Sequence, residues 1–312
     1  MNVFLSIALF IQGLAAGAIR SGTSILYAAL GEVIVERAGI VNLGLEGCML
    51  MGAAFGFIAT VQSGNAYVGL LAAAIAGGLF NLVLGFLVVT RRASQLASGL
   101  VLLFLATGLT ALVGASYVGQ RINGLDQFSI PLLVQIPWFG PVLFEGDVLT
   151  FGIVPCSLVV WWALYRTRWG LWLRTVGESR RVAYATGLNP RWVQYQALAI
   201  GGMLGGLGGA QLSLSYAHAW IENMTAGRGF IAVALVIFAS WQPLRVILGA
   251  LLFGGAIAFQ LQLQARNAPV SPFLLNMIPY LLTLLVLLAL GRKRRYQMPE
   301  GLKEVFEGTQ TS

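Results

Sequence analysis

Long apolar runs fill most of this sequence, and they constrain the fold more than any other feature. A helix needs about 20 predominantly apolar residues to cross the hydrocarbon core of a bilayer. Seven runs meet that requirement clearly, two more are short or interrupted, and one opens the chain. The runs cover residues 3–19, 23–37, 40–61, 67–90, 94–116, 148–165, 193–216, 228–241, 246–262 and 273–291. The pattern predicts an all-α polytopic membrane protein with about ten transmembrane helices.

The charge content agrees with a lipid environment. Only 10% of the 312 residues are charged, whereas soluble domains carry about 25%. Too little charge remains to build a hydrated shell around a protein of this size. The net charge of +8 comes largely from arginines gathered at the ends of apolar runs, not spread over a folded face. This distribution excludes a nucleic-acid partner and favours contact with membrane lipid.

The arginine clusters predict the orientation of the chain. Positively charged residues concentrate in cytoplasmic loops, so Arg91–Arg92, the loop 166–192 and Arg292–Arg295 are expected on that side. Alternating the runs from these points puts both termini in the cytoplasm. We therefore expect one transmembrane domain over residues 1–291, which includes the basic loop, and a short cytoplasmic tail at 292–312.

The two halves of the chain echo each other weakly. Ala38-Gly39 and Ala226-Gly227 each open an apolar run, and a Gly-Gly pair follows in each half, at Gly77-Gly78 and at Gly254-Gly255. In the predicted orientation the corresponding segments run in opposite directions. Such an inverted repeat would put a solute path between the two halves. Chance similarity between helices rich in Gly, Ala and Leu is the alternative.

The segment 32–47 carries charged and polar groups inside an apolar stretch. A charged side chain at the centre of a bilayer costs about 2.5–3.5 kcal/mol, so it persists where it pairs or faces protein or water. One interpretation is a tight cytoplasmic turn in which Glu36 and Arg37 are solvated. Asn42 and Glu46 lie farther into the next run, and we expect them to face the protein interior.

A second informative segment lies in the basic loop 166–192. Glu178 or Ser179 can cap a short helix there, and Gly187 can end it. Such a helix is too short to be stable alone in water, which indicates docking into a partner. A basic loop attracted to anionic lipid headgroups is the simpler interpretation. The docking residues singled out are Glu178, Ser179, Arg180, Arg181, Ala183, Ala185 and Gly187.

Two glycine-rich segments remain. In residues 201–209 small residues recur at a spacing of four, which predicts close helix packing and no chemistry. Arg228 stands between Gly227 and Gly229 at the start of an apolar run. It either anchors the outer interface or reaches the pore.

The chain lacks the residues that several kinds of chemistry require. Two cysteines in apolar runs and a single histidine give neither a disulfide framework nor a histidine-based metal centre. No G-x-x-x-x-G-K-[ST] loop is present to hold nucleotide phosphates. We therefore expect no cofactor in this chain and any ATP to bind a partner. No catalytic set is clustered either, which argues against a membrane enzyme.

Three motifs resemble a family of bacterial ABC importer permeases. They are Gly39-Ile-Val-Asn-Leu-Gly-Leu-Glu-Gly47, the stretch from Arg168-Trp-Gly-Leu to Thr186-Gly-Leu, and Gly227-Arg-Gly-Phe-Ile-Ala232. The family includes permeases for branched-chain amino acids, for ribose and other simple sugars, and for nucleosides, and the first motif resembles the nucleoside branch most. Val182-Ala183 stands where the family often has two alanines, a change that keeps this face small and apolar.

The resemblance implies a subunit of the bacterial inner membrane that receives its solute from an external binding protein. Two permeases, commonly unlike in the nucleoside branch, would form the path, and two ATPases would dock on the cytoplasmic helices. By this resemblance the residues from Glu178 to Gly187 couple the permease to the ATPase. Asn42, Glu46 and Arg228 are then the candidates for the substrate path.

Two alternatives stay open. A simple-sugar permease fits the same motifs, because a nucleoside itself contains a ribose ring. A secondary transporter driven by an ion gradient would use the same helices, with an intramembrane carboxylate such as Glu46 as its proton site. Such a carrier would need no ATPase.

Overall fold

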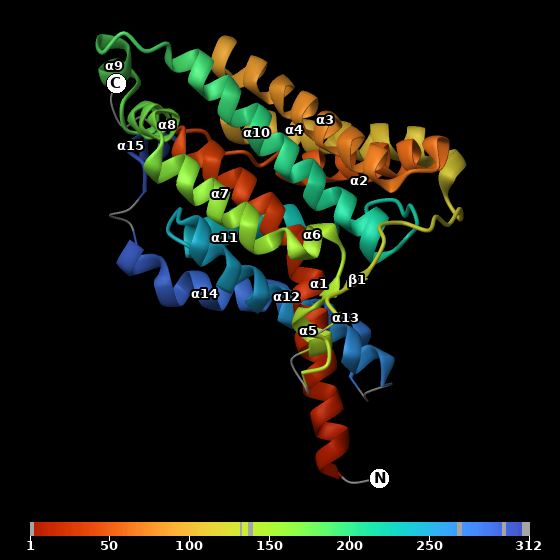
Figure 1. The fold of residues 1–312 in the computed structure, drawn as a ribbon. Helices are drawn as coiled ribbons and strands as arrows, with labels where there is room; N and C mark the ends of the chain where they lie inside the picture. The colour runs from red at the N-terminus through yellow and green to blue at the C-terminus, as the bar shows by residue number, and fades with distance from the viewer. Residues whose placement is uncertain (1–2, 132, 137–139, 267–269, 295–297, 308–312) are drawn as a thin grey trace.

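Helices make up nearly all the regular structure of the computed structural model, which describes residues 3–131, 133–136, 140–266, 270–294 and 298–307 (Figure 1). The α-helices are α1 (Val3–Arg37), α2 (Leu45–Ser63), α3 (Ala66–Gly85), α4 (Gln95–Gly114), α5 (Gly140–Leu143), α6 (Val148–Phe151), α7 (Ile153–Arg166), α8 (Arg168–Glu178), α9 (Arg180–Ala185), α10 (Pro190–Ala210), α11 (Arg228–Phe238), α12 (Pro243–Ala265), α13 (Pro272–Asn276), α14 (Ile278–Arg294) and α15 (Glu300–Glu307).

Short irregular elements extend or connect these helices. Two π-helical segments, η1 (Phe86–Thr90) and η3 (Gln211–Tyr216), continue α3 and α10, and a 3₁₀ turn, η2 (Ala115–Tyr117), continues α4. Strands β1 (Phe128–Ser129) and β2 (Glu145–Gly146) pair antiparallel, with the first residue of β1 opposite the last residue of β2. Because these strands have two residues each, the all-α prediction is confirmed.

Six helices in the described part of the chain are long and apolar enough to cross a membrane, by length and composition. They cover Ala8–Arg37, Leu45–Ser63, Ala66–Thr90, Gln95–Tyr117, Pro190–Tyr216 and Pro243–Ala265. Shorter apolar helices cover Ile153–Arg166, Arg228–Phe238 and Phe273–Leu285. These helices support a multi-pass membrane protein, while the predicted number of ten transmembrane helices is not confirmed.

The apolar runs 3–19 and 23–37 do not form separate helices, so that part of the prediction is wrong. They form α1, a single helix of 35 residues that is about 52 Å long. Arg20 does not interrupt it, because arginine is a good helix former. Gly22 lets α12 approach, since a Cβ there would lie 2.6 Å from the carbonyl oxygen of Ala250. One helix cannot return the chain to its starting side, so the prediction of two cytoplasmic termini loses its support.

Glycines bring α10 against its neighbours across the centre of the bundle. A Cβ on Gly52 of α2 would lie 2.2 Å from the carbonyl oxygen of Gly206, and one on Gly31 of α1 would lie 2.4 Å from that of Gly201. Backbones this close leave no room for side chains between them, which is how small residues pack membrane helices. The packing role predicted for residues 201–209 is confirmed.

The segments that suggested an inverted repeat make similar contacts. α3 packs on α10, where a Cβ on Gly77 would lie 2.3 Å from the carbonyl oxygen of Gly202. α12 packs on α1, where a Cβ on Gly254 would lie 2.2 Å from the carbonyl oxygen of Ala18. These contacts agree with an inverted repeat, which stays a prediction.

Apolar side chains cover the outside of the bundle. Phe104 and Leu112 of α4 are 72% and 78% exposed, and Leu248 of α12 is 70% exposed. Charged groups such as Glu32 and Glu36 are buried instead. A soluble protein has the opposite distribution, so this surface fits a lipid environment.

The basic loop 166–192 and the tail meet at one end of the molecule. α8, α9 and α15 gather there, and the N-terminal end of α1 projects from the opposite side (Figure 1). A cleft of about 970 Å³ at this end is lined by the arginines Arg92, Arg180, Arg181 and Arg191. The basic clusters at 91–92 and 166–192 therefore share a side, as predicted. Of the third cluster, Arg292–Arg294 end α14 and Arg295 lies outside the described residues.

Candidate functional site

The chain between α1 and α2 leaves helical geometry at residues 38–44 and yet stays largely buried. Backbone groups without partners are costly there, above all at membrane depth. Two glutamines supply the partners. Gln95 Oε1 accepts from Val41 N at 2.8 Å, and Gln194 Nε2 donates to Ala38 O at 3.1 Å. The break is therefore built into the protein interior.

Asn42 fixes this break to three helices. Its backbone N–H donates to Glu32 Oε1 of α1 at 2.9 Å. Its side chain donates to Asn81 Oδ1 of α3 at 2.9 Å, and Asn81 donates in turn to Leu198 O of α10 at 2.7 Å. The interior position predicted for Asn42 is confirmed. Asn81 was not predicted as a site residue, although an asparagine inside the apolar run 67–90 was an available signal.

Glu36 and Arg37 also face protein, so their interpretation as a solvated pair is wrong. Glu36 is 1% exposed and accepts a hydrogen bond from Trp241 Nε1. The Arg37 guanidinium donates to Trp241 O and to the Tyr165 hydroxyl, each at 3.3 Å. These bonds tie the end of α1 to α7 and to the turn that follows α11.

The carboxylate of Glu46 joins two interrupted helices. It lies in the first turn of α2 and is 3% exposed. Oε1 accepts from Thr225 Oγ1 at 2.6 Å and from Gly227 N at 2.7 Å, and Oε2 accepts from Gly229 N at 2.5 Å. These donors surround the start of α11, where unsatisfied backbone N–H groups attract negative charge. α11 has 11 residues, or about 16 Å, and begins inside the bundle at this carboxylate.

The backbones of the two helix starts are in direct contact. A Cβ on Gly229 would lie 2.6 Å from the Cα of Glu46, so only glycine fits between α11 and α2. Gly227 has a φ of 82°, a conformation that glycine adopts at little cost. The interior position predicted for Glu46 is confirmed, and its part in a substrate path stays a prediction.

The Arg228 side chain extends from the same turn towards η3. Its guanidinium carbon lies 5.8 Å from the centroid of the Tyr216 ring, and Nη1 donates to Met224 O at 3.4 Å. The side chain is half-buried. The structure therefore brings Arg228 beside Glu46, whereas Asn42 belongs to a separate set of hydrogen bonds.

The short helix predicted in the basic loop is α9, and its ends are the predicted ones. Ser179 Oγ accepts from Val182 N at 3.3 Å as the N-cap. Gly187, with a φ of 81°, follows the last turn. The exposed predicted residues around α9 are Glu178, Arg180, Arg181, Ala185 and Gly187. No partner is present, so docking on this helix stays a prediction.

The residues that α9 exposes differ from those that the sequence predicted as its docking face. Ala183 is fully buried against the body of the protein, whereas Val182 and Tyr184 are 55% and 76% exposed. The surface that a partner can reach is therefore built from these two larger side chains. Tyr184 was not predicted as a docking residue, although an aromatic residue in a short basic helix was an available signal.

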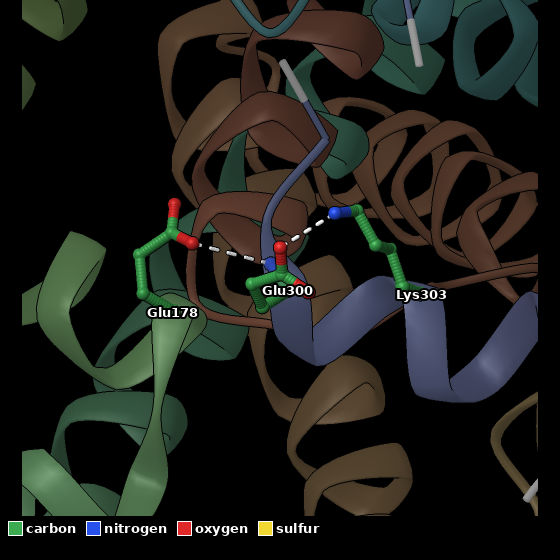
Figure 2. Close-up of polar contacts among 3 residues, drawn as sticks. All are labelled: Glu178, Glu300 and Lys303. Atoms are coloured by element: carbon green, nitrogen blue, oxygen red, sulfur yellow. Dashed lines mark hydrogen bonds and ion pairs between the residues drawn. The ribbon is translucent and has the colours of Figure 1, made fainter. Parts of the chain in front are cut away.

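The tail helix α15 contacts Glu178, the last residue of α8. Figure 2 shows the Glu178 carboxylate accepting from the backbone N–H of Glu300 at 3.3 Å. It also shows Lys303 Nζ at 2.5 Å from Glu300 Oε1. The predicted tail 292–312 thus includes a helix that reaches the basic loop, which its length alone did not suggest.

Replacing Leu302 with aspartate is expected to release α15. Leu302 is fully buried, and the neighbouring Gly301 lies so close to α8 that a Cβ there would be 2.8 Å from Gly177 O. Burying a leucine contributes about 1.5–3 kcal/mol, so tail cleavage should rise by about tenfold or more. Limited proteolysis of the purified complex measures this rate. Leu302→Met should leave the rate unchanged, and equal rates for the wild type and Leu302→Asp would contradict the docking.

Comparison with known proteins identifies the family. Residues 14–289 match the family model described as branched-chain amino acid transport system, permease component. A putative glucose ABC transporter permease protein of Haloferax volcanii is 38% identical in an alignment that covers 89% of this chain and 91% of that protein. A nucleoside ABC transporter permease protein of Lactococcus lactis is 33% identical, over 86% of this chain and 90% of that protein. A guanosine ABC transporter permease protein of Bacillus subtilis is also 33% identical, over 84% and 87%.

These matches cover most of the chain, including both of its halves. They also agree with the apolar helices and the buried helix breaks described above. The relatives are permease subunits, which work with a separate ATPase subunit, so the chain is not an enzyme. The chain belongs to the branched-chain amino acid transport system permease family and is a permease subunit of an ABC transporter.

Proposed function

We propose that this permease imports nucleosides across a bacterial inner membrane. The observation that carries the proposal is the match of most of the chain to ABC permeases, two of them named for nucleoside or guanosine transport. An external binding protein delivers the solute, and this chain forms the path with a second homologous permease. Two ATPases bind the ATP and drive the change in access, and the permease itself needs no cofactor.

Simple-sugar import is the second candidate, favoured by the 38% identity to the putative glucose permease of Haloferax volcanii. Uptake of labelled guanosine and labelled glucose by cells that express the complete transporter separates the two. Guanosine uptake that excess glucose does not inhibit supports the nucleoside proposal. Glucose uptake that excess guanosine does not inhibit transfers the assignment to sugars, and uptake of neither solute rejects both.

The proposed path passes the junction of α2 and α11, two helices that start inside the bundle. Transporters commonly bind solutes where interrupted helices begin. In this proposal Glu46 fixes both helix starts, Arg228 stands on the outer side of the junction and Asn42 on the cytoplasmic side. With the arginine clusters in the cytoplasm, α1 crosses the membrane once and its N-terminal end lies outside.

The three donors around Glu46 also bear on the ion-driven alternative. Both oxygens of the Glu46 carboxylate are engaged by three donors at the start of α11. A proton site would have to release and take up a proton in each cycle. The surroundings of Glu46 therefore favour a fixed anchor over a proton carrier.

The proposed coupling surface is α9 with its flanking residues. Of the residues predicted from the sequence, Glu178, Arg180, Arg181, Ala185 and Gly187 are its exposed members and Ser179 is the half-buried N-cap, whereas Ala183 is buried and does not belong to it. We add Val182 and Tyr184 as the apolar contacts of the ATPase, because both are exposed. The tail helix α15 contacts the Glu178 side of this surface.

The double replacement Val182→Asp and Tyr184→Asp is expected to release the ATPase. Apolar contacts at the centre of an interface are each worth about 1 kcal/mol or more, so the ATPase recovered with the permease should fall by about tenfold. Quantitative co-purification in mild detergent measures this loss. The control Gln120→Asp changes an exposed residue at the opposite end of the bundle. Full recovery of the ATPase with the double variant would contradict the coupling surface.

A further inference from the structure

The cleft of about 970 Å³ beside α9 is strongly basic. It lies between α9, the end of η1 and the start of α10, and four arginines line it: Arg92, Arg180, Arg181 and Arg191. None of the described residues of the lining carries a carboxylate, and Arg92, Arg181 and Arg191 form no ion pair with a described residue. Four guanidinium groups around one cavity repel one another and attract an anion.

Two of the candidate membrane spans end at this cleft, which puts it at the level of the lipid headgroups. The span Ala66–Thr90 ends two residues before Arg92, and Arg191 is the second residue of the span Pro190–Tyr216. Trp192 is exposed beside Arg191, as aromatic side chains often are at the boundary between membrane and water. Because clustered arginines mark the cytoplasmic side, the cleft opens at the cytoplasmic surface of the bilayer.

An apolar surface lies along α3 below this cleft. Leu79, Val83 and Phe86 are spaced by four and three residues, so they share one face of the helix, and all three are exposed. Leu79 and Val83 also line an apolar groove of about 760 Å³ between α2 and α3. Phe86 begins η1, and Val89 of the same segment lines the cleft. A surface for hydrocarbon chains and a basic site therefore lie at successive depths along one helix.

These two features together indicate one molecule that carries both a phosphate and hydrocarbon chains. Guanidinium groups bind phosphate through paired N–H donors, and basic pockets between membrane helices at the cytoplasmic surface bind anionic headgroups. A soluble phosphate would use the arginines alone. An acidic segment of the ATPase would approach from the cytoplasm, where the exposed Val182 of the coupling surface does not line the cleft. An anionic phospholipid accounts for both the arginines and the apolar face of α3.

We propose that the cleft between α9 and α10 binds the phosphate headgroup of an anionic phospholipid of the cytoplasmic leaflet. Arg92 and Arg191 contact the phosphate from the ends of the two spans, Arg180 and Arg181 contact it from α9, and the hydrocarbon chains lie along the exposed face of α3. Because Arg180 and Arg181 also belong to the proposed coupling surface, the bound lipid lies next to the docked ATPase. The proposal goes beyond the proposed function, since it holds for a nucleoside importer and for a sugar importer alike.

Photolabelling of the complete transporter tests this lipid site. The complex is purified with its ATPase and second permease in mild detergent and is mixed with phosphatidylglycerol that carries a photoactivatable group in its acyl chain. Phosphatidylcholine with the same chain is the zwitterionic counterpart. After irradiation and digestion, mass spectrometry measures the label on residues 79–90 of this chain.

Two double variants with the same loss of charge separate the cleft from the rest of the basic end. Arg92→Gln/Arg191→Gln removes two cleft arginines that lie outside the proposed coupling surface. The control Arg91→Gln/Arg168→Gln removes two exposed arginines that do not line the cleft. Arg91 is the neighbour of Arg92, and Arg168 begins α8 at the same end of the molecule (Figure 1).

The lipid site predicts strong labelling by phosphatidylglycerol and at least about tenfold weaker labelling by phosphatidylcholine. Arg92→Gln/Arg191→Gln should lower the labelling by phosphatidylglycerol by about tenfold or more, because each arginine beside an anionic headgroup contributes a factor of about five to the affinity. The control should keep the wild-type labelling. Both variants should retain the ATPase, since neither changes the proposed coupling surface.

Four results would overturn the proposal. Equal labelling by the two lipids would show that the headgroup is not recognised, and equal losses in the two double variants would show a diffuse attraction of the basic end for anionic lipid. Displacement of the phosphatidylglycerol by the same concentration of glycerol phosphate would indicate a site for a soluble phosphate. Loss of the ATPase from Arg92→Gln/Arg191→Gln with unchanged labelling would assign the cleft to an acidic segment of the ATPase. None of these measurements uses the imported solute, so this test is independent of the test of the proposed function.

Discussion

A Glu46→Ala variant is expected to lose more than about nine-tenths of its ATP-driven uptake. The alanine leaves three donors without an acceptor: the Thr225 hydroxyl and the N–H groups of Gly227 and Gly229. Each buried donor left unsatisfied costs about 1–3 kcal/mol, and 1.4 kcal/mol already corresponds to a factor of ten. The start of α11 then no longer has a fixed position beside α2. Uptake per correctly inserted complex is the quantity to measure.

Two further substitutions separate the hydrogen bonds of Glu46 from its size. Glu46→Gln keeps the shape of the side chain and loses the charge, and its amide group cannot accept from both Gly227 and Gly229. It should therefore lose most of the uptake as well. Thr225→Ala removes one of the three donors and should have the smallest effect. Normal uptake by Glu46→Ala would show that the carboxylate does not hold the junction.

Gly206→Val is expected to prevent assembly of the bundle. A Cβ at position 206 would lie 2.2 Å from the carbonyl oxygen of Ala73 in α3, and α2 approaches the same turn at Gly52. Overpacked cores lose about 1–3 kcal/mol even when side chains can move aside. Here the obstacle is backbone on two sides, so the loss should exceed about 3 kcal/mol. Detergent-solubilised protein should elute as aggregate or be degraded in the cell.

Gly108 of α4 provides the matched control for this substitution. A Cβ at that position meets no atom within 4 Å. Gly108→Val therefore makes the same chemical change in an apolar helix without a clash. It should yield a monodisperse protein with normal uptake. If Gly206→Val were as stable as Gly108→Val in a thermal unfolding assay, the close packing of α10 would be contradicted.

Local signals in the sequence were sufficient for some elements. The cap and end of α9 could be predicted from Ser179 and Gly187, because a hydroxyl N-cap and a glycine after the last turn act within a few residues. The packing role of residues 201–209 followed from residue size alone. The continuity of α1 could not be predicted in this way. An arginine and three small residues at positions 20–23 look like a loop until α12 is known to pack against them.

Local signals in the sequence could not identify the hydrogen-bond partners of the buried polar groups. Glu46 and Gly229 are 183 positions apart, and Asn81 and Leu198 are 117 apart. The cost of charge at membrane depth predicted that Asn42 and Glu46 face protein, without indicating which groups they meet. Ala183 shows the same limit on a smaller scale. Its place in a motif suggested a docking residue, whereas the body of the protein decides which face of α9 is exposed.

The central claim is that this chain carries solute only as part of an ATP-driven importer. The most direct test reconstitutes the permease into liposomes together with its co-expressed ATPase, second permease and binding protein. Uptake of labelled guanosine is then compared with ATP, without ATP, and with ATP plus vanadate. Our account predicts guanosine uptake with ATP in the absence of vanadate. It predicts no uptake without ATP and none with ATP plus vanadate. Uptake by the permease alone, driven by a proton or sodium gradient without ATP, would contradict it.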